Sequence, residues 1–499
     1  MKLLSKALPL ALCVMVGCSH AERKIKRILH FSDVHLNLSA SLDAQDSAAI
    51  PFKYYEDAPI ALLESALEYA RSVLPDPDFF LYTGDHAAHG TFTDDYIARA
   101  VETNVRTFEK YYPTGNPKMV ETTAIIGNAD GNPDYHMEVT DPDEETNPSI
   151  ELISPVWEHS MSKSNFEVFN RRGYLKLPLD DNLFVLTLNT VPYSPSHVPD
   201  TSSLPDPFGQ FEWLNATLAE LRAFSKFAYI AGHIPPFVDS YGGNPQWQVH
   251  YIEKYKNIVR EYPDVIKAQF FGHVHSVEFR IPVDTTCAGP VCDSSHHVPV
   301  LVSGSLSPLF GNNPSFMAWD IDADTYEVLD YTVYGTNISE SDQQLAWKPL
   351  FKASTAYGVK TLGSTSLSDL YERMEADPAL LDAYYWNMKA LSYKAKPCGS
   401  TECRAQILCT LKWWTTKNEF LACVSSAISS LNAITRATPP PTVNHLPDSH
   451  VYTAIGVTVL VSAVVVATVA AVMRVLKSTG VIKTPEEREQ ERDGVFPML

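Results

Sequence analysis

Five short apolar runs in this chain each end in a polar turn that carries a side chain able to bind a metal ion. Side chains i and i+2 share one face of an extended backbone, so paired residues at such a turn can approach one ion together. The ligand-type residues are Asp33 and His35 after 28–31, Asp85 after 79–83, Asn128 after 123–126, His233 after 227–231, and His273 and His275 after 268–271. Because ligands gather at the carboxyl ends of strands in open sheets, we expect these turns to converge on one site.

The segments between these runs predict an α/β fold. Apolar residues at helical spacing cover 58–74, 93–112, 208–224 and 247–261, and two further strand-like runs cover 183–188 and 300–302. Strands that alternate with helices form layered domains with partly parallel sheets. Of the 499 residues, 45% are hydrophobic and 20% are charged, which is an ordinary balance for a globular protein with a large core.

The ligand-type residues suit two divalent metal ions. Asp85 has two carboxylate oxygens that can bridge the ions, and Asn128 supplies a neutral carbonyl oxygen. Ligation that is rich in imidazole and poor in carboxylate is typical of zinc. Two such ions about 3.5–4 Å apart hold a hydroxide and the phosphate oxygens for in-line attack. The sequence therefore predicts two Zn²⁺ ions as cofactors and a phosphate ester as substrate.

The motifs D-x-H, G-D, G-N, G-H and G-H-x-H occur here in the order of the calcineurin-like metallophosphoesterases, which this chain resembles over roughly residues 28–320. The resemblance implies a four-layer sandwich of two sheets between helices. It also implies two ligand sets. The first metal takes Asp33, His35, Asp85 and His275, and the second takes Asp85, Asn128, His233 and His273.

A histidine four residues after the bridging aspartate narrows the resemblance to the acid sphingomyelinase-like phosphodiesterases. At this spacing, where His89 stands, the family places a histidine beside the phosphate, so the resemblance implies a catalytic role for His89. A packing role is the alternative for this residue. Ala129 stands where the sphingomyelinase pattern has the histidine of Asn-His-Glu, a proposed proton donor, and the nearby His136 is a weaker candidate for that role. No saposin-like domain fits between residues 21 and 33.

A small helical region follows the catalytic part, so we expect a catalytic domain over 22–345 and a helical C-terminal domain over 346–433. Six cysteines outside the N-terminal segment allow fifteen pairings, so sequence alone does not decide the connectivity. Their close spacing predicts disulfides, with a zinc cluster as the alternative. The expected pairs are Cys287–Cys292, Cys398–Cys403 and Cys409–Cys423, and Asn37, Asn215 and Asn337 stand in glycosylation sequons.

The N-terminal segment has the pattern of a secretory signal peptide. Residues 1–21 begin with Lys2 and Lys6, continue with a short apolar stretch, and end in small residues. A buried N-terminal helix is one alternative, and a bacterial lipoprotein signal around Cys18 is another. We expect the mature chain to enter the secretory pathway.

The C-terminal segment predicts one transmembrane helix. Residues 451–473 contain no charge and are long enough to cross a bilayer. Arg474 and Lys477 follow directly, which by the positive-inside rule places the tail 474–499 in the cytosol. A lipid-anchor signal is the competing interpretation, although such signals lack a charged tail. Residues 434–450 are rich in proline and predict a stalk.

These features together predict a single-pass type I membrane protein that is a monomer. Its catalytic domain lies outside the cell or in the lumen of a lysosome or vacuole. The expected activity is zinc-dependent hydrolysis of a small or lipid phosphodiester, such as sphingomyelin or a nucleotide, by a metal-bound hydroxide. The net charge of −20 excludes a nucleic-acid binder.

Two other functions are weighed against this one. An endopolyphosphatase of the same superfamily ranks lower, because no cluster of lysine or arginine is present to guide a polyanion. A membrane-tethered binding protein without activity belongs to a different class. It is disfavoured because every ligand position holds a competent residue.

The expected topology is testable with protease added to intact cells. The stalk at 434–450 should be cut, while the tail 474–499 should be protected because the membrane lies between it and the protease. Epitope tags in the two segments, read by immunoblot, report the result. Digestion of the tail from outside would reverse the orientation.

Overall fold

The computed structural model describes residues 24–38, 51–112, 123–141, 143–283, 297–339, 341 and 343–437. The described residues up to Ile434 form one compact unit, which contains both β-sheets of the described chain. Several sequence-predicted features lie outside the described residues: the signal peptide 1–21, Cys287 and Cys292, most of the stalk, the segment 451–473 and the tail 474–499. Within the described ranges, no helix has the length and apolar character needed to cross a bilayer.

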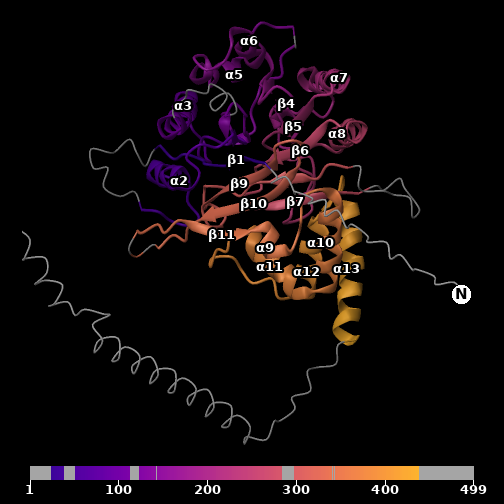
Figure 1. Ribbon diagram of the computed structural model, residues 1–499. Coiled ribbons are helices and arrows are strands. Elements are labelled where there is room, and N and C mark those ends of the chain that lie inside the picture. Colours follow the sequence, from indigo (N-terminus) through magenta and orange to yellow (C-terminus); the bar gives the residue numbers. More distant parts are fainter. Residues whose placement is uncertain are drawn as a thin grey trace, which may run out of the picture. The chain divides into compact units, whose positions relative to one another are not determined.

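Two β-sheets face each other at the centre of the fold (Figure 1). Their strands are β1 (Ile25–Phe31), β2 (Phe79–Tyr82), β3 (Leu175–Pro178), β4 (Leu183–Thr187), β5 (Phe227–Ala231), β6 (Ile266–Phe271), β7 (Glu278–Pro282), β8 (Val300–Val302), β9 (Ser315–Asp322), β10 (Val328–Gly335), β11 (Lys348–Lys352) and β12 (Lys412–Trp413). One sheet has the order β11-β10-β9-β1-β2, and the other has the order β12-β7-β8-β6-β5-β4-β3. Both sheets are mixed: β1 pairs in parallel with β2 and antiparallel with β9, and β5 and β6 pair in parallel while β3 and β4 are antiparallel.

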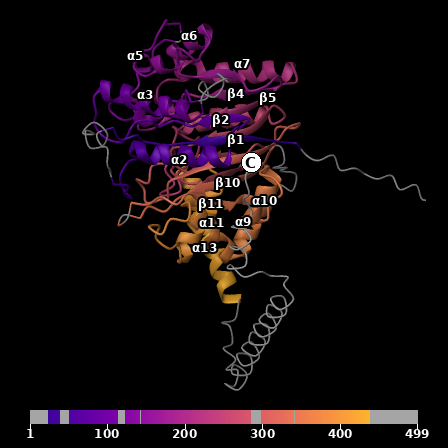
Figure 2. The same ribbon diagram turned by 60° about the vertical axis from the view of Figure 1, so that its left-hand side comes forward.

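Helices cover the outer faces of the two sheets and gather at one end of them. The helices are α2 (Ile60–Val73), α3 (Asp94–Tyr111), α5 (Pro148–Glu151), α6 (Lys163–Arg172), α7 (Gln210–Ala223), α8 (Val249–Glu261), α9 (Ala353–Tyr357), α10 (Ser364–Ala376), α11 (Pro378–Met388), α12 (Thr401–Thr410) and α13 (Lys417–Ala437), with short 3-10 helices at Asn128–Asp130, Ser154–Trp157, Val191–Tyr193 and Pro207–Gly209. Helices α2 and α3 lie on the five-stranded sheet, and α7 and α8 lie on the seven-stranded sheet (Figure 1). Helices α9–α13 lie beneath the sheets, near β7 and β11, in Figure 1, and Figure 2 again shows α9, α11 and α13 beneath β11.

The alternation of side chains along β1 explains why the sheets pack in layers. His30 faces the second sheet, where its ring lies 6.0 Å from that of Phe270 on β6. Phe31 faces the helices, with its ring 5.7 Å from Phe108 of α3 and 4.8 Å from Phe316 of β9. Because successive residues of a strand point to opposite faces, one strand serves both layers of the core.

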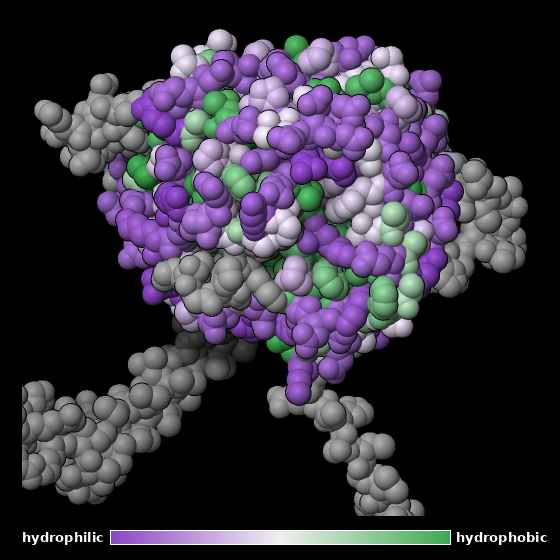
Figure 3. All heavy atoms as spheres, turned by 90° about the horizontal axis from the view of Figure 1, so that it is seen from above, coloured by the Kyte–Doolittle hydropathy of each residue, from purple (hydrophilic) through white to green (hydrophobic). Residues whose placement is uncertain are grey.

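The seven-stranded sheet has its own core on its outer face. Leu186 of β4 and Ile230 of β5 are fully buried and pack in one cluster with Leu214 of α7 and Ile252 of α8. On the face of the described unit seen in Figure 3, hydrophilic residues predominate, and hydrophobic residues form smaller groups between them.

The structure differs from the sequence-based expectation at residues 123–126. This apolar run is buried but forms no strand, and Ile125 bonds instead to Thr123 through its backbone. The apolar character of residues 123–126 therefore predicts their burial correctly, but it does not show that they belong to a sheet. Strands β3, β7, β9, β10, β11 and β12 were not among the expected strands.

The C-terminal residues contribute to both sheets as well as forming helices. Strand β11, which lies within the range 346–433, pairs with β10, and β12 pairs in parallel with β7. Two of the expected disulfides are present, Cys398–Cys403 and Cys409–Cys423. The second of them joins α12 to α13.

A core substitution in β1 should measure how much the layered packing stabilises the fold. Phe31 is fully buried among aromatic rings, so Phe31→Ala should lower the free energy of unfolding by about 3–5 kcal/mol. Phe224, at the end of α7, is 69% exposed, so the matched change Phe224→Ala should cost less than about 0.5 kcal/mol. Denaturant unfolding of the two variants tests this, and equal losses would contradict the assignment of Phe31 to the core.

Candidate active site

The structure brings all seven sequence-predicted ligand residues to one place. They follow the carboxyl ends of β1, β2, β5 and β6, and Asn128 begins a 3-10 helix beside them. Asp85 is central, since its Oδ2 lies 3.1 Å from His35 Nε2 and 2.9 Å from His233 Nε2. Asn128 Oδ1 lies 3.1 Å from the same His233 nitrogen.

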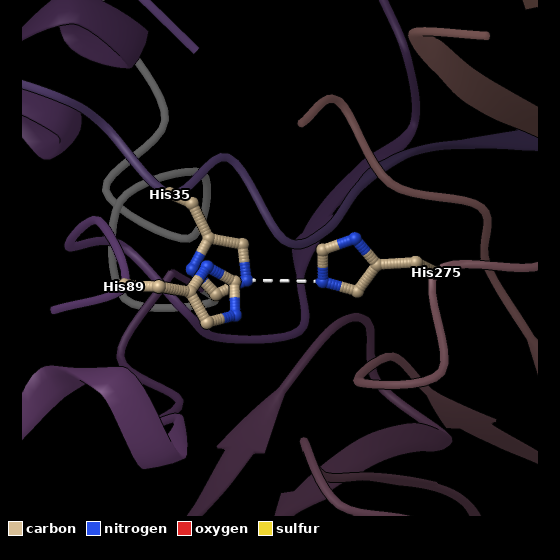
Figure 4. Close-up of side chains that lie close together, drawn as sticks. All are labelled: His35, His89 and His275. Carbon is tan, nitrogen blue, oxygen red and sulfur yellow. Dashed lines mark hydrogen bonds between the residues drawn. The ribbon is translucent and has the colours of Figure 1, made fainter. Parts of the chain in front are cut away.

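The remaining ligands close the two sides of this cluster. His275 Nε2 lies 3.1 Å from His35 Nε2 and 3.4 Å from Asp33 Oδ1, and Figure 4 shows the two rings turned toward each other. A ring nitrogen of His273 and one oxygen or nitrogen each from Asp85 and His233 lie within 4.8 Å of one another. The cluster therefore has two halves that share Asp85.

Most of these residues occupy a backbone region that L-amino acids rarely adopt. The φ angles are 50° at Asp33, 47° at His35, 60° at Asp85, 71° at His273 and 52° at His275. Such left-handed residues cost free energy and persist where the surrounding structure enforces them, most often at functional sites. The backbone conformation of these turns therefore costs conformational free energy, and it directs the ligand side chains toward one site.

Glycine precedes the ligands because there is no room for a side chain. A Cβ atom on Gly127 would lie 2.1 Å from Asp85 Oδ1, and a Cβ atom on Gly272 would lie 2.1 Å from Ser32 Oγ. Any larger residue at these positions would displace a carboxylate of the site.

A chain of buried hydrogen bonds runs from the core between the sheets to Asp33. The Trp319 indole N–H donates to His30 Nδ1 at 3.1 Å, so His30 Nε2 carries the proton and donates to Thr83 Oγ1 at 2.9 Å. Thr83 Oγ1 then donates to Ser32 Oγ at 2.6 Å, and Ser32 Oγ donates to Asp33 Oδ2. Burial lowers the pKa of His30 to about 3, so this link is neutral. The chain fixes the orientation of the Asp33 carboxylate.

Burial and opposite charges pull the pKa values of the site apart. Burial raises the pKa of Asp33 to about 6. Burial would also raise the pKa of Asp85, but His233 and His35 outweigh it and hold that pKa well below its usual range. Burial would lower the pKa of His35, yet Asp85 outweighs it and raises the pKa to about 10. Burial alone dominates at His273, where the pKa falls to about 3.

These residues fit a pair of divalent cations. His35 Nε2 and His275 Nε2 point at each other across 3.1 Å with a carboxylate oxygen beside each, so lone pairs converge where a cation would satisfy them. The donor set of carboxylate oxygens, one amide oxygen and imidazole nitrogens is that of a zinc or related site. The raised pKa of His35 has the same origin, because a proton there offsets the buried negative charge.

His89 lies against this cluster and is held by a residue that sequence analysis missed. Its ring stacks on that of His35 with 3.8 Å between centroids (Figure 4), and its side chain is 28% exposed. Asp57 accepts hydrogen bonds from the His89 backbone N–H at 2.8 Å and from His89 Nδ1 at 3.1 Å. Ser307 Oγ donates to the same carboxylate at 3.0 Å. His89 Nε2 is therefore the ring nitrogen available to a substrate.

The residues after Asn128 have structural roles. Ala129 N–H donates to Asp85 Oδ1 at 2.9 Å. Asp130 is buried and accepts backbone hydrogen bonds from His86, Ala87 and Gly127, which ties the two ligand loops together. His136 lines a separate cavity of about 170 Å³ with Asp130, away from the ligand cluster. These hydrogen bonds between the two loops give the aspartate at position 130, two residues after Asn128, a structural role.

Two side chains outside the predicted set also contact the ligands. Gln246 Oε1 accepts a hydrogen bond from His273 Nε2 at 3.0 Å. Phe310 is 55% exposed and stands edge-on to His275, with 4.7 Å between ring centroids. Neither residue belongs to a motif. The sequence feature that could have pointed to Phe310 is its aromatic side chain within a segment of mostly small and polar residues.

Comparison with known proteins agrees with this geometry. Residues 26–277 match the family model of the calcineurin-like phosphoesterases, which is about half of the chain. The chain belongs to this family. Residues 291–429 of this phosphoesterase also match the model described as the acid sphingomyelin phosphodiesterase C-terminal region. It is accordingly a metal-dependent hydrolase of a family that uses a dinuclear metal centre.

Several curated proteins are similar to this phosphoesterase over most of its length. It is 28% identical to sphingomyelinase phosphodiesterase D of Dictyostelium discoideum, covering 68% of this chain and 75% of the relative. It is 28% identical to human acid sphingomyelinase-like phosphodiesterase 3b, covering 72% and 78%. It is 24% identical to the human cyclic GMP-AMP phosphodiesterase, covering 77% and 84%. The phosphoesterase thus resembles the acid sphingomyelinase-like branch along most of its length.

Replacement of the shared carboxylate should abolish metal binding. Asp85→Asn removes one negative charge from between two cations that would then repel each other, so most of the bound metal and nearly all activity should be lost. Metal content by mass spectrometry after dialysis measures this. Asp95 of α3 is 79% exposed, and the control Asp95→Asn should keep both ions. An Asp85→Asn enzyme with two metals and full activity would refute the site.

Proposed function

We propose that this phosphoesterase is a zinc phosphodiesterase that hydrolyses small or lipid phosphodiesters of the sphingomyelin or nucleotide type. The observation that carries the proposal is the His89–Asp57 pair beside the ligand cluster. The names of the relatives cover both substrate types, since they include sphingomyelinase phosphodiesterases and a cyclic GMP-AMP phosphodiesterase.

The chain's own ligands determine where the cations would lie. Asp33, His35, Asp85 and His275 would hold one ion, and Asp85, Asn128, His233 and His273 would hold the other. When bound, two such ions supply positive charge for the phosphate and activate a water molecule for attack at phosphorus. Imidazole-rich ligation supports zinc as the metal.

The protein must also supply a proton to the leaving group. An alkoxide that leaves phosphorus needs an acid, and a positioned acid contributes about 10²–10⁴-fold in rate. Ala129 has no proton to give. His89 meets the requirement of position, because Asp57 binds Nδ1 and so orients the ring beside the cluster, which leaves Nε2 for the substrate. His89 donates from Nε2 to the leaving oxygen and then regains a proton from solvent.

The location of the protein is proposed from sequence and cysteine chemistry together. We propose a monomeric single-pass type I membrane protein with its catalytic domain outside the cell or in the lumen of a lysosome or vacuole. Two disulfides in the C-terminal helices support an oxidising compartment. Asn215 and Asn337 of the glycosylation sequons are exposed, and Asn37 is partly exposed.

His89→Ala separates acid catalysis from metal binding. The variant should keep both metals and lose about 10²–10⁴-fold in kcat/KM on an alkyl phosphodiester, which needs the acid. The loss should be much smaller on a p-nitrophenyl ester, whose leaving group is stable without a proton. His250 is exposed on α8, and the control His250→Ala should leave both rates unchanged. Equal losses on both esters would mean that His89 orients the phosphate and the acid lies elsewhere.

A substrate panel tests the activity itself. Bis-p-nitrophenyl phosphate, sphingomyelin, ATP and polyphosphate are offered to the enzyme with and without chelator. We expect chelator-sensitive cleavage of diesters. Cleavage of polyphosphate alone would identify an endopolyphosphatase instead.

A further inference from the structure

The loop at residues 237–246 lies between two of the metal ligands, His233 and His273, in the sequence. It follows His233 in sequence, and its last residue, Gln246, contacts His273. The loop closes on itself through an antiparallel bridge between Val238 and Pro245. Both ligands that flank it belong to the second metal set.

A single carboxylate, that of Asp239, organises this 237–246 loop. Its Oδ1 accepts backbone hydrogen bonds from Tyr241 at 2.9 Å, Gly242 at 2.6 Å and Gly243 at 3.0 Å. Its Oδ2 accepts hydrogen bonds from the Asn244 and Gln246 side-chain amides at 3.2 and 3.3 Å. The loop therefore has a fixed shape that ends at Gln246.

The orientation of the Gln246 amide follows from its neighbours. The amide nitrogen faces two groups that can only accept, the Asp239 carboxylate and the Asn244 carbonyl oxygen at 3.0 Å. The amide oxygen must then face His273 Nε2, which lies 3.0 Å away. An amide oxygen accepts and does not donate, so Nε2 of the neutral ring must carry the proton. The lone pair of His273 is consequently on Nδ1.

We infer that Gln246 is a positioning residue that fixes the tautomer of His273 and so prepares its Nδ1 for the second metal ion. Partners of this kind, which bind the far nitrogen of a ligating imidazole, raise metal affinity by orienting the ring. The inference concerns the metal centre and not the substrate. Metal binding therefore tests it whether or not the proposed diesterase activity is found.

The C-terminal helices hold the 237–246 loop in place. Gln406 of α12 donates to the Tyr241 carbonyl oxygen at 2.6 Å, and Lys417 of α13 donates to Asn244 Oδ1 at 2.9 Å. Phe420 of α13 lies so close to Gly243 that an added Cβ would be 2.3 Å from its ring. The helical region thus contributes to the second metal site through this loop, although it supplies none of the seven ligands.

The test is a metal titration of the purified full-length protein and its Gln246→Leu variant. Zinc affinity at each site is measured by competition with a chelator. Gln246→Leu should lose about 10–100-fold in affinity at one site and keep the other. The matched control is Gln248→Leu, two residues on, where the side-chain amide donates to the exposed Asp200 at 3.3 Å and, among the described residues, contacts no metal ligand. This control should bind two ions as the wild type does.

One further variant keeps the outcome decisive. Should Gln246→Leu fail to fold, as judged by circular dichroism, Gln246→Met keeps the side-chain length without the amide and should show the same selective loss at one site. Wild-type zinc affinity at both sites in Gln246→Leu or Gln246→Met would overturn the inference, and so would an equal loss at the two sites.

Discussion

Asp33 and Asp85 bring two carboxylates to the centre of the site, and their side chains are almost completely buried. Isolated buried charges of this kind are costly unless paired or bound to metal. The surrounding histidines offset part of the cost of burying these charges. The Nε2 atoms of His35 and His233 lie 3.1 and 2.9 Å from Asp85 Oδ2. The other ligand turns bring histidines and Asn128 to these two residues, and the histidines offset part of their charge.

The strained turns are tolerated because they rest on rigid strands. The carboxyl-terminal halves of strands β1, β2, β5 and β6 are buried, with residues such as Phe31 and Phe270 fully enclosed. A residue with positive φ placed directly after such a strand cannot relax without disturbing the core behind it. The layered packing therefore stabilises the ligand geometry, and the ligands in turn carry the chemistry at the rim of the sheets.

The parts of the site that could be predicted from sequence are those encoded over a few residues. Asp33 and His35 stand two apart after an apolar strand, and His273 and His275 repeat that spacing, so the local pattern reports their common direction. Cys409 and Cys423 are close in sequence, and they form a disulfide.

The parts of the site that could not be predicted from sequence depend on contacts between residues far apart in the chain. Asp57 lies 32 residues before His89, and Gln246 lies 27 residues before His273, with no periodicity to connect either pair. The run at 123–126 shows the opposite failure, because apolar residues predict burial equally well inside and outside a sheet.

The hydrogen-bond chain that ends at Asp33 has a direction, because it begins at a group that can only donate. The Trp319 indole cannot accept, so His30, Thr83 and Ser32 must each pass their donor one step toward the carboxylate. Reversing any link would leave a buried donor facing another donor. All hydrogen bonds of this chain therefore point in the same direction, toward Asp33. The Asp33 carboxylate is thus held as an acceptor before any cation binds. Binding of a cation at Asp33 then requires little rearrangement of this part of the core, since the carboxylate is already oriented in the folded chain.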